Sequence, residues 1–440
     1  MKSLKKKNRP EIHWNNSLTN GDKLLEEATI HEKAMLVGRV GLELLSCGTG
    51  AWRVRNSMNK IARVLNVECS VDIGLMSLSF NCFDSSECVT QTLNLSNTCV
   101  NTFKLYRLEG FVKKFSREGE NMTVAQVHAK LDEYNKLSPL YSPVLLGFAA
   151  GFACCAFTFL LGGGLWEMAL AFLGATIGNF VRSLLNRKHY NLFMTVALSV
   201  SGACISYAAF LKLFNLIFGL SMAHQAGYIC AMLFIIPGFP FITAGIDFAK
   251  LDMRSGIERL CYAVNIVLVA ALCGWFMAVL LGLHPADFLP QNLNWWSLLL
   301  FRLLASFFGV FGFSIMFNSP VKLACLAASI GSLSNTIRLE LIDFASCPPG
   351  LAAFFGALLA GLLASLLKKK SGYPRISITV PSVVIMVPGL YFYKGIYNLG
   401  SMDLPESASW LSAALLVTLA LPFGLVAARV LTDKSFRHGA

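Results

Sequence analysis

Two Pro-Gly pairs interrupt apolar stretches of this 440-residue chain, and their backbone groups are the first candidates for binding chemistry. Pro237-Gly238 and Pro388-Gly389 each lie inside a run long enough to cross a membrane. A helix broken at membrane depth leaves amides and carbonyls unpaired, which is tolerated only where the gap is buried in protein or lines a polar cavity. Such breaks at corresponding places in two halves are typical of a secondary transporter's substrate site. We therefore predict that the freed groups bind the carboxylate and ammonium of a small zwitterion.

Five polar side chains within the apolar stretches are further candidates for contacting a substrate. Thr176 and Asn179 lie three residues apart on one helix face, where close helix packing and a substrate contact are equally good explanations. Asn335 and Arg338 have the same spacing, and Arg338 is expected to extend towards the membrane surface. Lys394 follows the second break, where it could pair with a substrate carboxylate or anchor the helix at the outer membrane surface.

Two acidic residues are candidates for coupling transport to protons. Asp247 follows the first break by about two and a half helical turns, and a buried carboxyl there could load and release protons near neutral pH. The alternative for Asp247 is a solvated loop, paired with Lys250 or Arg254. Glu167 begins the second apolar stretch, which follows a triple glycine, and lies either at the membrane surface or at a gated proton entry.

The composition is that of a membrane protein with a polar N-terminal domain. Hydrophobic residues make up 55% of the chain and the mean hydropathy is +0.58, which is too apolar for a soluble protein of this length. Residues 1–140 hold 19 of the 37 Lys and Arg residues and 15 of the 25 Asp and Glu residues. The start, residues 1–7, is basic without a following apolar run, so no signal peptide is expected there.

The charges and cysteines exclude several function classes. The net charge of +12 is explained by basic loops that orient a membrane protein, so no nucleic-acid partner is expected. The thirteen cysteines form no CxxC pair and accompany no clustered histidines, so we expect buried free thiols and no metal site. The chain has no phosphate-binding loop for ATP, and no cofactor is expected.

Ten stretches are long and apolar enough to cross a hydrocarbon core about 30 Å thick, which takes roughly 20 residues each. With the N-terminal domain in the cytoplasm, 14 of the 18 cations after residue 140 fall at the inner ends of these stretches. We therefore predict a multi-pass protein of the cell membrane, inner or plasma, with both termini cytoplasmic. The stretches are 143–161, 165–184, 191–211, 226–248, 260–282, 297–317, 321–338, 349–367, 376–396 and 409–430.

Loop charges predict that the two halves of the membrane part are inverted repeats. Five spans per half is an odd number, so the second half must enter the membrane from the opposite side. Equivalent loops exchange basic character between the halves, and the Pro-Gly breaks lie 151 residues apart. The predicted fold is an α-helical polytopic membrane protein with ten helices in a 5+5 inverted repeat, arranged for alternating access. The expected domains are 1–140, 141–283 and 284–440.

The N-terminal domain is predicted to be a small α+β unit. Apolar residues recur every three or four positions across 22–65, which predicts two helices separated by a turn at 46–50. Residues 67–83 and 98–108 are rich in β-branched and aromatic residues and are predicted strands. Residues 123–134 are a predicted helix capped by Thr123. Gly48-Thr49-Gly50 could cradle a phosphate, but it does not follow a strand, so a turn joining helices is favoured.

Several short segments, in their order along the chain, resemble the threonine/serine exporter family in its single-chain form, a cytoplasmic domain followed by ten spans. The similarity extends from about residue 32 onward. It implies export of L-threonine and L-serine driven by the proton gradient, and it leaves homo-oligomer formation open. The segments are Leu44-Leu45-Ser46-Cys47-Gly48, Trp52-Arg53-Val54, Ile61-Ala62-Arg63-Val64-Leu65, Pro237-Gly238, Gly245-Ile246-Asp247, Asp252-Met253-Arg254-Ser255-Gly256, Gly312-Phe313-Ser314-Ile315-Met316-Phe317-Asn318 and Val387-Pro388-Gly389.

Three other functions remain open at the level of sequence. The same scaffold could carry another small amino acid or a dicarboxylate, which richer intramembrane positive charge would favour. A membrane enzyme would need paired acids or a His/Asp set facing one cavity, whereas His189, His224 and His284 all lie near loops. A receptor with the N-terminal domain as its output is the third alternative, although that domain has no recognisable catalytic motif.

Overall fold

A computed structural model of the protein describes residue 14 and residues 23–289 and 291–437, so the basic start lies outside the described residues. The chain divides into two units. The first contains the chain up to Pro139 together with Asp247–Arg259, and the second contains Leu140–Ile246 and Leu260–Ala440. The first unit thus includes a short segment from later in the chain, which contains the end of one helix and the start of the next.

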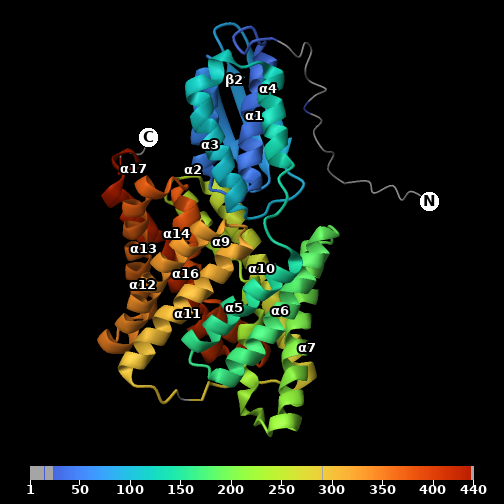
Figure 1. Ribbon diagram of the computed structural model, residues 1–440, viewed down its shortest axis with the longest axis vertical. Coiled ribbons are helices and arrows are strands. Elements are labelled where there is room, and N and C mark those ends of the chain that lie inside the picture. The colour runs from blue at the N-terminus through green and yellow to red at the C-terminus, as the bar shows by residue number, and fades with distance from the viewer. Residues whose placement is uncertain (1–13, 15–22, 290, 438–440) are drawn as a thin grey trace, which may run out of the picture. The chain divides into compact units, whose positions relative to one another are not determined.

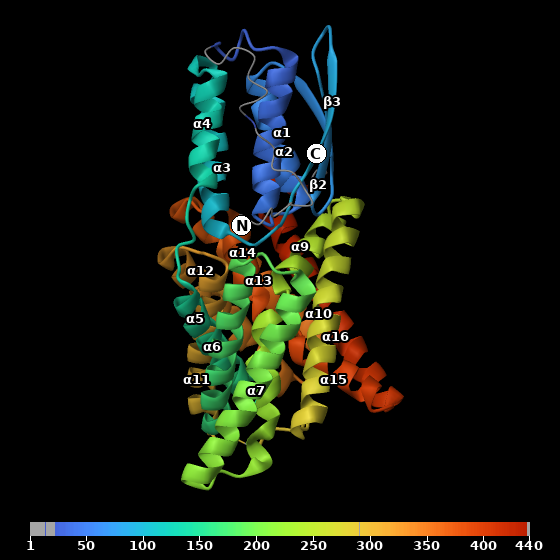
Figure 2. The same ribbon diagram turned by 90° about the vertical axis from the view of Figure 1, so that its right-hand side faces the viewer.

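The first unit has three layers, which Figure 2 shows edge-on: a sheet, a pair of helices against it, and a second pair of helices. The sheet is antiparallel in the order β1-β2-β3, with Val71 opposite Phe80 and Phe80 opposite Gln91. The elements of the first unit are α1 (Ile30–Ser46), α2 (Ala51–Val64), β1 (Glu68–Ile73), β2 (Ser77–Phe83), β3 (Cys88–Asn94), α3 (Thr102–Glu118) and α4 (Val124–Asn135).

Local sequence signals explain most of this unit. The two N-terminal helices, the turn between them and the helix capped by Thr123 are confirmed, and the Thr123 hydroxyl accepts the Gln126 amide. The strand predicted at 98–108 is wrong, because α3 begins there. Asn101 caps this helix by accepting the Lys104 amide at 3.0 Å. The helical spacing of its buried side chains outweighs their β propensity; these are Thr102, Leu105, Leu108, Phe111, Val112 and Phe115.

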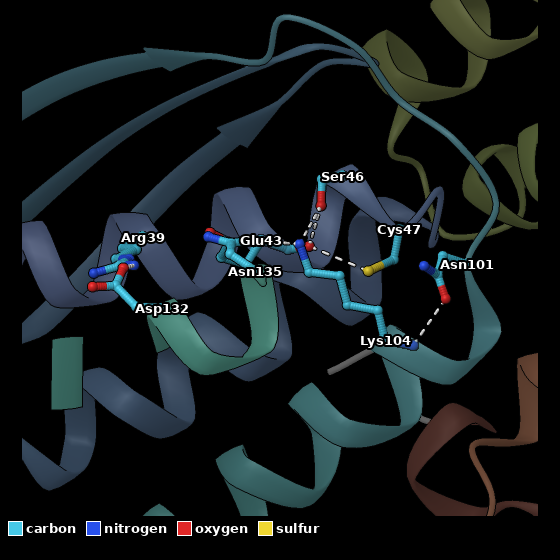
Figure 3. A network of polar contacts seen from close by, with 8 residues as sticks. All are labelled: Arg39, Glu43, Ser46, Cys47, Asn101, Lys104, Asp132 and Asn135. Carbon is cyan, nitrogen blue, oxygen red and sulfur yellow. Dashed lines mark hydrogen bonds and ion pairs between the residues drawn. The ribbon is translucent and has the colours of Figure 1, made fainter. Parts of the chain in front are cut away.

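A buried polar network ties α1 to α3 and α4 (Figure 3). The Lys104 ammonium donates to Glu43 at 2.7 Å and to Asn135 at 2.6 Å, and Asn135 also donates to Glu43. Arg39, fully buried on α1, forms an ion pair with Asp132 of α4. Because burying a charge without a partner is costly, these contacts fix how the three helices pack.

The second unit is all helical (Figure 1). Close packing at small residues brings α5 against α11 and α13 against α16, because a side chain at Gly312 or Gly424 would collide with the facing helix. Its helices are α5 (Pro143–Leu160), α6 (Leu165–Arg187), α7 (Leu192–Phe218), η3 (Met222–Gly227), α8 (Tyr228–Met232), η4 (Leu233–Ile235), α9 (Gly238–Phe248), α10 (Met253–Leu281), α11 (Trp295–Met316), α12 (Val321–Ala345), α13 (Pro349–Ser371), α14 (Arg375–Val384), α15 (Gly389–Gly400), α16 (Leu404–Thr432) and α17 (Lys434–Arg437).

Seven helices among the described residues are long and apolar enough to cross a membrane, and two bent pairs raise the number to nine. The pair around the first Pro-Gly break bends by 53° and the pair around the second by 48°. The helix at the seventh predicted span, α12, is 25 residues long but does not meet the same standard of apolarity, and it carries Arg338, Glu340 and Asp343. A multi-pass membrane protein is therefore confirmed, whereas the count of ten and the 5+5 repeat stay predictions.

Candidate functional site

Both Pro-Gly pairs break the helix in the same way. Proline has no amide hydrogen and its ring clashes with the preceding turn, so the helix stops. At the first break the Gly238 amide donates to the Ile236 carbonyl at 2.9 Å, and at the second the Gly389 amide donates to the Val387 carbonyl at 2.8 Å. Each helix then resumes with its proline carbonyl accepting an amide four residues on. The two breaks have matching backbone geometry.

The two breaks pack against each other, residue for residue. A Cβ atom added at Gly238 would lie 3.1 Å from Val387, and one added at Gly389 would lie 2.9 Å from Ile236. Gly238 and Gly389 are 151 residues apart, and so are Ile236 and Val387. The contacts are therefore reciprocal, as they are across a two-fold axis. Each glycine allows apolar side chains of the other broken span to pack against its backbone.

Aromatic residues extend this contact beyond the breaks. Phe241 and Phe392, also 151 residues apart, stack with ring centroids 5.6 Å apart and planes 8° apart. The buried hydroxyls of Tyr228 on α8 and Tyr393 on α15 lie 2.8 Å apart. The two broken spans thus contact each other through both apolar and polar groups.

Where the breaks meet, the packing leaves a cavity of only about 10 Å³, room for about one water molecule. Every lining side chain is apolar. The junction of the broken helices is therefore closed to a substrate in this conformation. The lining residues are Phe157, Leu233, Ile236, Gly238, Phe313, Val384, Val387 and Gly389.

A larger cavity of about 360 Å³ is lined by Leu390, the residue directly after the second break. Its neighbour Gly389 lines the small cavity. The larger volume is within the usual range for small-molecule sites. Lys394 of α15 lines the larger cavity and forms an ion pair with Asp287 at 3.0 Å. The Lys394 ammonium also lies 4.7 Å from the centre of the Trp410 ring.

A second cation, Arg302 of α11, also lines the larger cavity. It forms ion pairs with Glu340 at 2.8 Å and with Asp343, both on α12. The Gln291 side chain, which lines the same cavity, donates to the Gly163 carbonyl at 2.5 Å. The cavity therefore offers two cations, one exposed carboxylate and an amide to a small charged molecule.

The intramembrane asparagines hold helices together instead of lining either cavity. The Asn179 amide donates to the Leu146 carbonyl of α5 at 2.7 Å, and the Asn335 amide donates to the Ser306 hydroxyl of α11 at 2.8 Å. The Thr176 hydroxyl bonds back to the Phe172 carbonyl of its own helix. Of the predicted substrate-binding residues, the two Pro-Gly pairs therefore come together in the described structure. Lys394 lines the larger cavity, further along α15 from the second pair.

A repeated Asn-x-x-Arg pattern escaped the sequence analysis. Asn179 and Arg182 on α6 recur as Asn335 and Arg338 on α12, 156 residues later. Arg182 donates to the Phe234 carbonyl, next to the first break, at 3.2 Å, whereas Arg338 bonds back to Asn335 at 3.0 Å. Arg338 therefore does not extend outward as predicted. Comparing the two halves position by position would have revealed this pattern.

Glu167 is buried at the start of α6, with only 1% of its surface exposed. One carboxylate oxygen lies 2.7 Å from Nδ1 of His224, and the other is buried with no hydrogen-bond partner among the described residues. Leaving a buried polar oxygen without a partner is costly, so this carboxyl group is a candidate for a role beyond packing. Whether Glu167 lies at the membrane surface or at a gated proton entry stays a prediction.

Asp247, the other predicted proton carrier, lies at the end of α9 in the first unit, where it is fully buried. Its carboxylate accepts the Ala51 amide at 3.0 Å and the Ser255 hydroxyl at 2.9 Å, and it forms an ion pair with Arg259 at 3.1 Å. The solvated-loop alternative is thus wrong, since Asp247 is fully buried and these three partners are buried too. The proposed proton role of Asp247 stays a prediction.

These contacts explain the Gly48-Thr49-Gly50 turn. Gly50 is the residue before α2 and has no side chain to cap it, so Asp247 supplies the carboxylate at this helix N-terminus. A Cβ at Gly50 would lie 2.7 Å from that carboxylate. Arg259 donates to the Thr49 carbonyl at 2.6 Å. The turn joins two helices, as favoured from sequence. The anion bound at this turn is the Asp247 carboxylate of the same chain.

Comparison with known proteins assigns the fold to a family of transporters. The family model for the threonine/serine exporter matches residues 35–282, more than half of the chain, and a second model, "Threonine/Serine exporter, ThrE", matches residues 302–431. The chain belongs to the threonine/serine exporter family. This confirms the resemblance seen in the sequence, and two models in one chain agree with its single-chain form.

Curated relatives include two proteins named "Probable succinate transporter subunit YjjP". That of Klebsiella aerogenes is 25% identical over 248 residues, covering 53% of this chain and 86% of the relative. That of Escherichia coli is 24% identical and covers 53% and 88%. "Pheromone-regulated membrane protein 10" of Debaryomyces hansenii is 21% identical over 82% of this chain and 36% of its own length. No solved structure matches the chain significantly.

The reciprocal packing at the breaks makes a prediction. Gly389→Ala should reduce transport severalfold per inserted molecule, because its Cβ would collide with Ile236, and overpacking costs about 1–3 kcal/mol. Adding Ile236→Ala should restore part of the activity. Gly202→Ala is the matched control, since its Cβ would meet only Val181 at 3.9 Å. Wild-type transport by Gly389→Ala in reconstituted vesicles would contradict the close approach.

Proposed function

We propose that this chain is a secondary transporter that exports L-threonine and L-serine from the cytoplasm by proton antiport. On this proposal it lies in the inner or plasma membrane with both termini in the cytoplasm, and it catalyses no covalent reaction. Substrate binds near the two breaks, and its release on the outer side is coupled to proton entry.

The reciprocal contact of the broken spans is the observation that carries this proposal. A transporter of the alternating-access type needs two related halves that move against each other around one site. Gly238 contacts Val387 and Gly389 contacts Ile236, two contacts related by an offset of 151 residues, beside a cavity too small for a substrate. A second cavity of about 360 Å³ is lined by Leu390, the residue after the second break. Such an arrangement is expected for a closed gate next to an accessible vestibule. The unequal bonds of Arg182 and Arg338 fit two halves in different conformations.

The charges of the larger cavity favour a zwitterion. The Lys394 ammonium can bind a substrate carboxylate, and Asp287, whose side chain is 94% exposed, can turn to the substrate ammonium. A bound amino acid would replace the Lys394–Asp287 ion pair by two ion pairs of similar geometry. Its carboxylate would pair with Lys394 and its ammonium with Asp287. Small hydroxy-amino acids are therefore well matched to this ion pair and to the family's description.

A dicarboxylate is the second candidate, favoured by a different observation. Lys394 and Arg302 both line the cavity and could bind two carboxylates, and the bacterial relatives are named for succinate. Arg302 is already paired with Glu340 and Asp343, which lowers its attraction for an anion. We therefore place the zwitterion first.

For proton coupling we propose Glu167 ahead of Asp247. One buried carboxylate oxygen of Glu167 has no hydrogen-bond partner in the described part of the chain, and His224 beside it can exchange a proton with this carboxyl group. The Asp247 carboxylate already has an amide, a hydroxyl and an arginine as partners. We infer that Asp247 mainly fixes the end of α2.

The function is tested by efflux of labelled threonine, serine and succinate from vesicles reconstituted with the full chain. We expect threonine and serine efflux to rise when protons can flow inward. Asp287→Asn should slow threonine efflux about tenfold while leaving succinate efflux unchanged or faster, because a lost charge-assisted bond costs about 1.5–3 kcal/mol. Succinate efflux alone, faster than that of either amino acid, would establish the dicarboxylate function instead.

Proton coupling gives a separate prediction. Glu167→Gln should abolish the stimulation of threonine efflux by a pH gradient, yet retain exchange of labelled for unlabelled threonine, because exchange moves no net proton. Glu133→Gln, at an exposed acid of α4, is the control and should behave as wild type. Full gradient-driven efflux by Glu167→Gln would exclude Glu167 and make Asp247 the first candidate for proton coupling.

A further inference from the structure

The first unit contains a large open groove that the transport mechanism does not use. It has a volume of about 740 Å³ and lies between the C-terminal parts of α2 and α3. Its lining is dominated by positive charge, with five cationic side chains and no carboxylate. The lining residues are Lys60, Arg63, Val64, Gly110, Lys113, Lys114, Ser116 and Arg117.

Local acids leave most of this charge uncompensated. Lys114 forms a weak ion pair with Glu118 at 3.5 Å, between two side chains that are each more than 60% exposed. No other ion pair involves the groove cations among the described residues. Five like charges along one groove repel each other, which disfavours the empty state and favours binding of an anion.

Helix geometry gathers the charges on one wall. Gly110, Lys113, Lys114 and Arg117 are spaced at three, four and seven residues, so they share one face of α3. A Cβ atom at Gly110 would meet nothing within 4 Å, so no packing constraint requires glycine there. Glycine inside a helix costs about 1 kcal/mol relative to alanine. Its effect is to keep the floor of the groove open.

The two walls are held in place without any ligand. α2 and α3 both start at the same turn, where the Asn101 amide donates to the Cys47 carbonyl at 3.3 Å. An ion pair between Arg53 and Glu109 joins them further along. Buried side chains such as Met58 and Leu108 face the interior of the unit. The groove is therefore a preformed site, which reduces the entropy lost on binding.

We propose that this groove binds a ligand carrying two or more phosphate groups. Arginine and lysine side chains spaced along a preformed groove match several closely spaced phosphates, which arginine binds through two parallel hydrogen bonds. No aromatic side chain lines the groove, so recognition rests on the phosphates and not on stacking of a base. The phosphates could belong to a soluble polyphosphorylated metabolite or to a lipid headgroup.

A ligand here would act on the segment that joins α9 to α10. Lys60 and Arg63 lie in the last turns of α2, and the same helix begins at Ala51, where its amide is held by Asp247. All of these residues belong to the first unit. Binding at one end of a 14-residue helix can therefore alter the buried Asp247 contacts at its other end.

The test uses the purified full chain in a neutral detergent and inorganic tripolyphosphate as the probe, measured by titration calorimetry. We expect saturable binding that weakens as salt is raised. Lys113→Ala/Arg117→Ala should weaken it at least tenfold, whereas Lys130→Ala/Lys136→Ala, which removes the same charge from exposed positions on and just after α4, should change it less than twofold. Gly110→Leu should also weaken binding, by filling the floor without changing charge, while the helix stays intact.

Vesicles containing phosphatidylglycerol or the doubly charged cardiolipin distinguish the two sources of phosphate. Groove-dependent binding of tripolyphosphate in detergent indicates a soluble ligand. Binding to cardiolipin vesicles alone, lost in Lys113→Ala/Arg117→Ala, indicates a lipid headgroup. Absence of saturable binding in both assays would overturn the proposal, and so would equal loss in the groove variant and the Lys130/Lys136 control. Threonine transport does not enter these measurements, so their failure leaves the transport function untouched.

Discussion

The structure of the membrane unit depends on one constraint, namely that a helix broken inside a membrane must have its backbone buried. The two Pro-Gly breaks meet this constraint by covering each other. Glycine at each break allows the facing chain to approach within contact distance, and neighbouring aromatic pairs complete the seal. Because each half covers the other, opening one break would expose the other. That mutual dependence is what a gate shared by two halves requires.

A carboxylate at a helix N-terminus organises the other unit. Asp247 reaches this unit from the end of a broken span and caps α2, and Arg259 compensates its charge while binding the turn before that helix. A buried ion pair of this kind is expensive unless its remaining hydrogen bonds are made, and here the amide, hydroxyl and carbonyl partners make them. The first unit is thereby built partly from the loop between two membrane helices.

Local signals predicted much of this architecture, and its long-range contacts escaped prediction. Hydropathy located seven membrane-spanning helices and the two bent pairs, and proline with glycine located both breaks. The strand predicted at 98–108 was wrong because the cap at Asn101 and the helical spacing of buried residues outweigh β propensity. The Lys394–Asp287 pair joins residues 107 apart, and the Glu167–His224 pair joins residues 57 apart. Nothing local marks such pairs, although the Asn-x-x-Arg repeat was visible in the sequence.

The central claim, that the mutual packing of the breaks is a gate, is tested most directly by locking it. Cysteines replacing Phe241 and Phe392, in a variant without its native cysteines, can be joined by a short, reducible bifunctional thiol reagent. We predict that the cross-linked protein loses threonine exchange in vesicles and regains it on reduction. The reagent should leave the exchange rate of either single-cysteine variant unchanged. Exchange at the uncross-linked rate with the bridge intact would contradict the account.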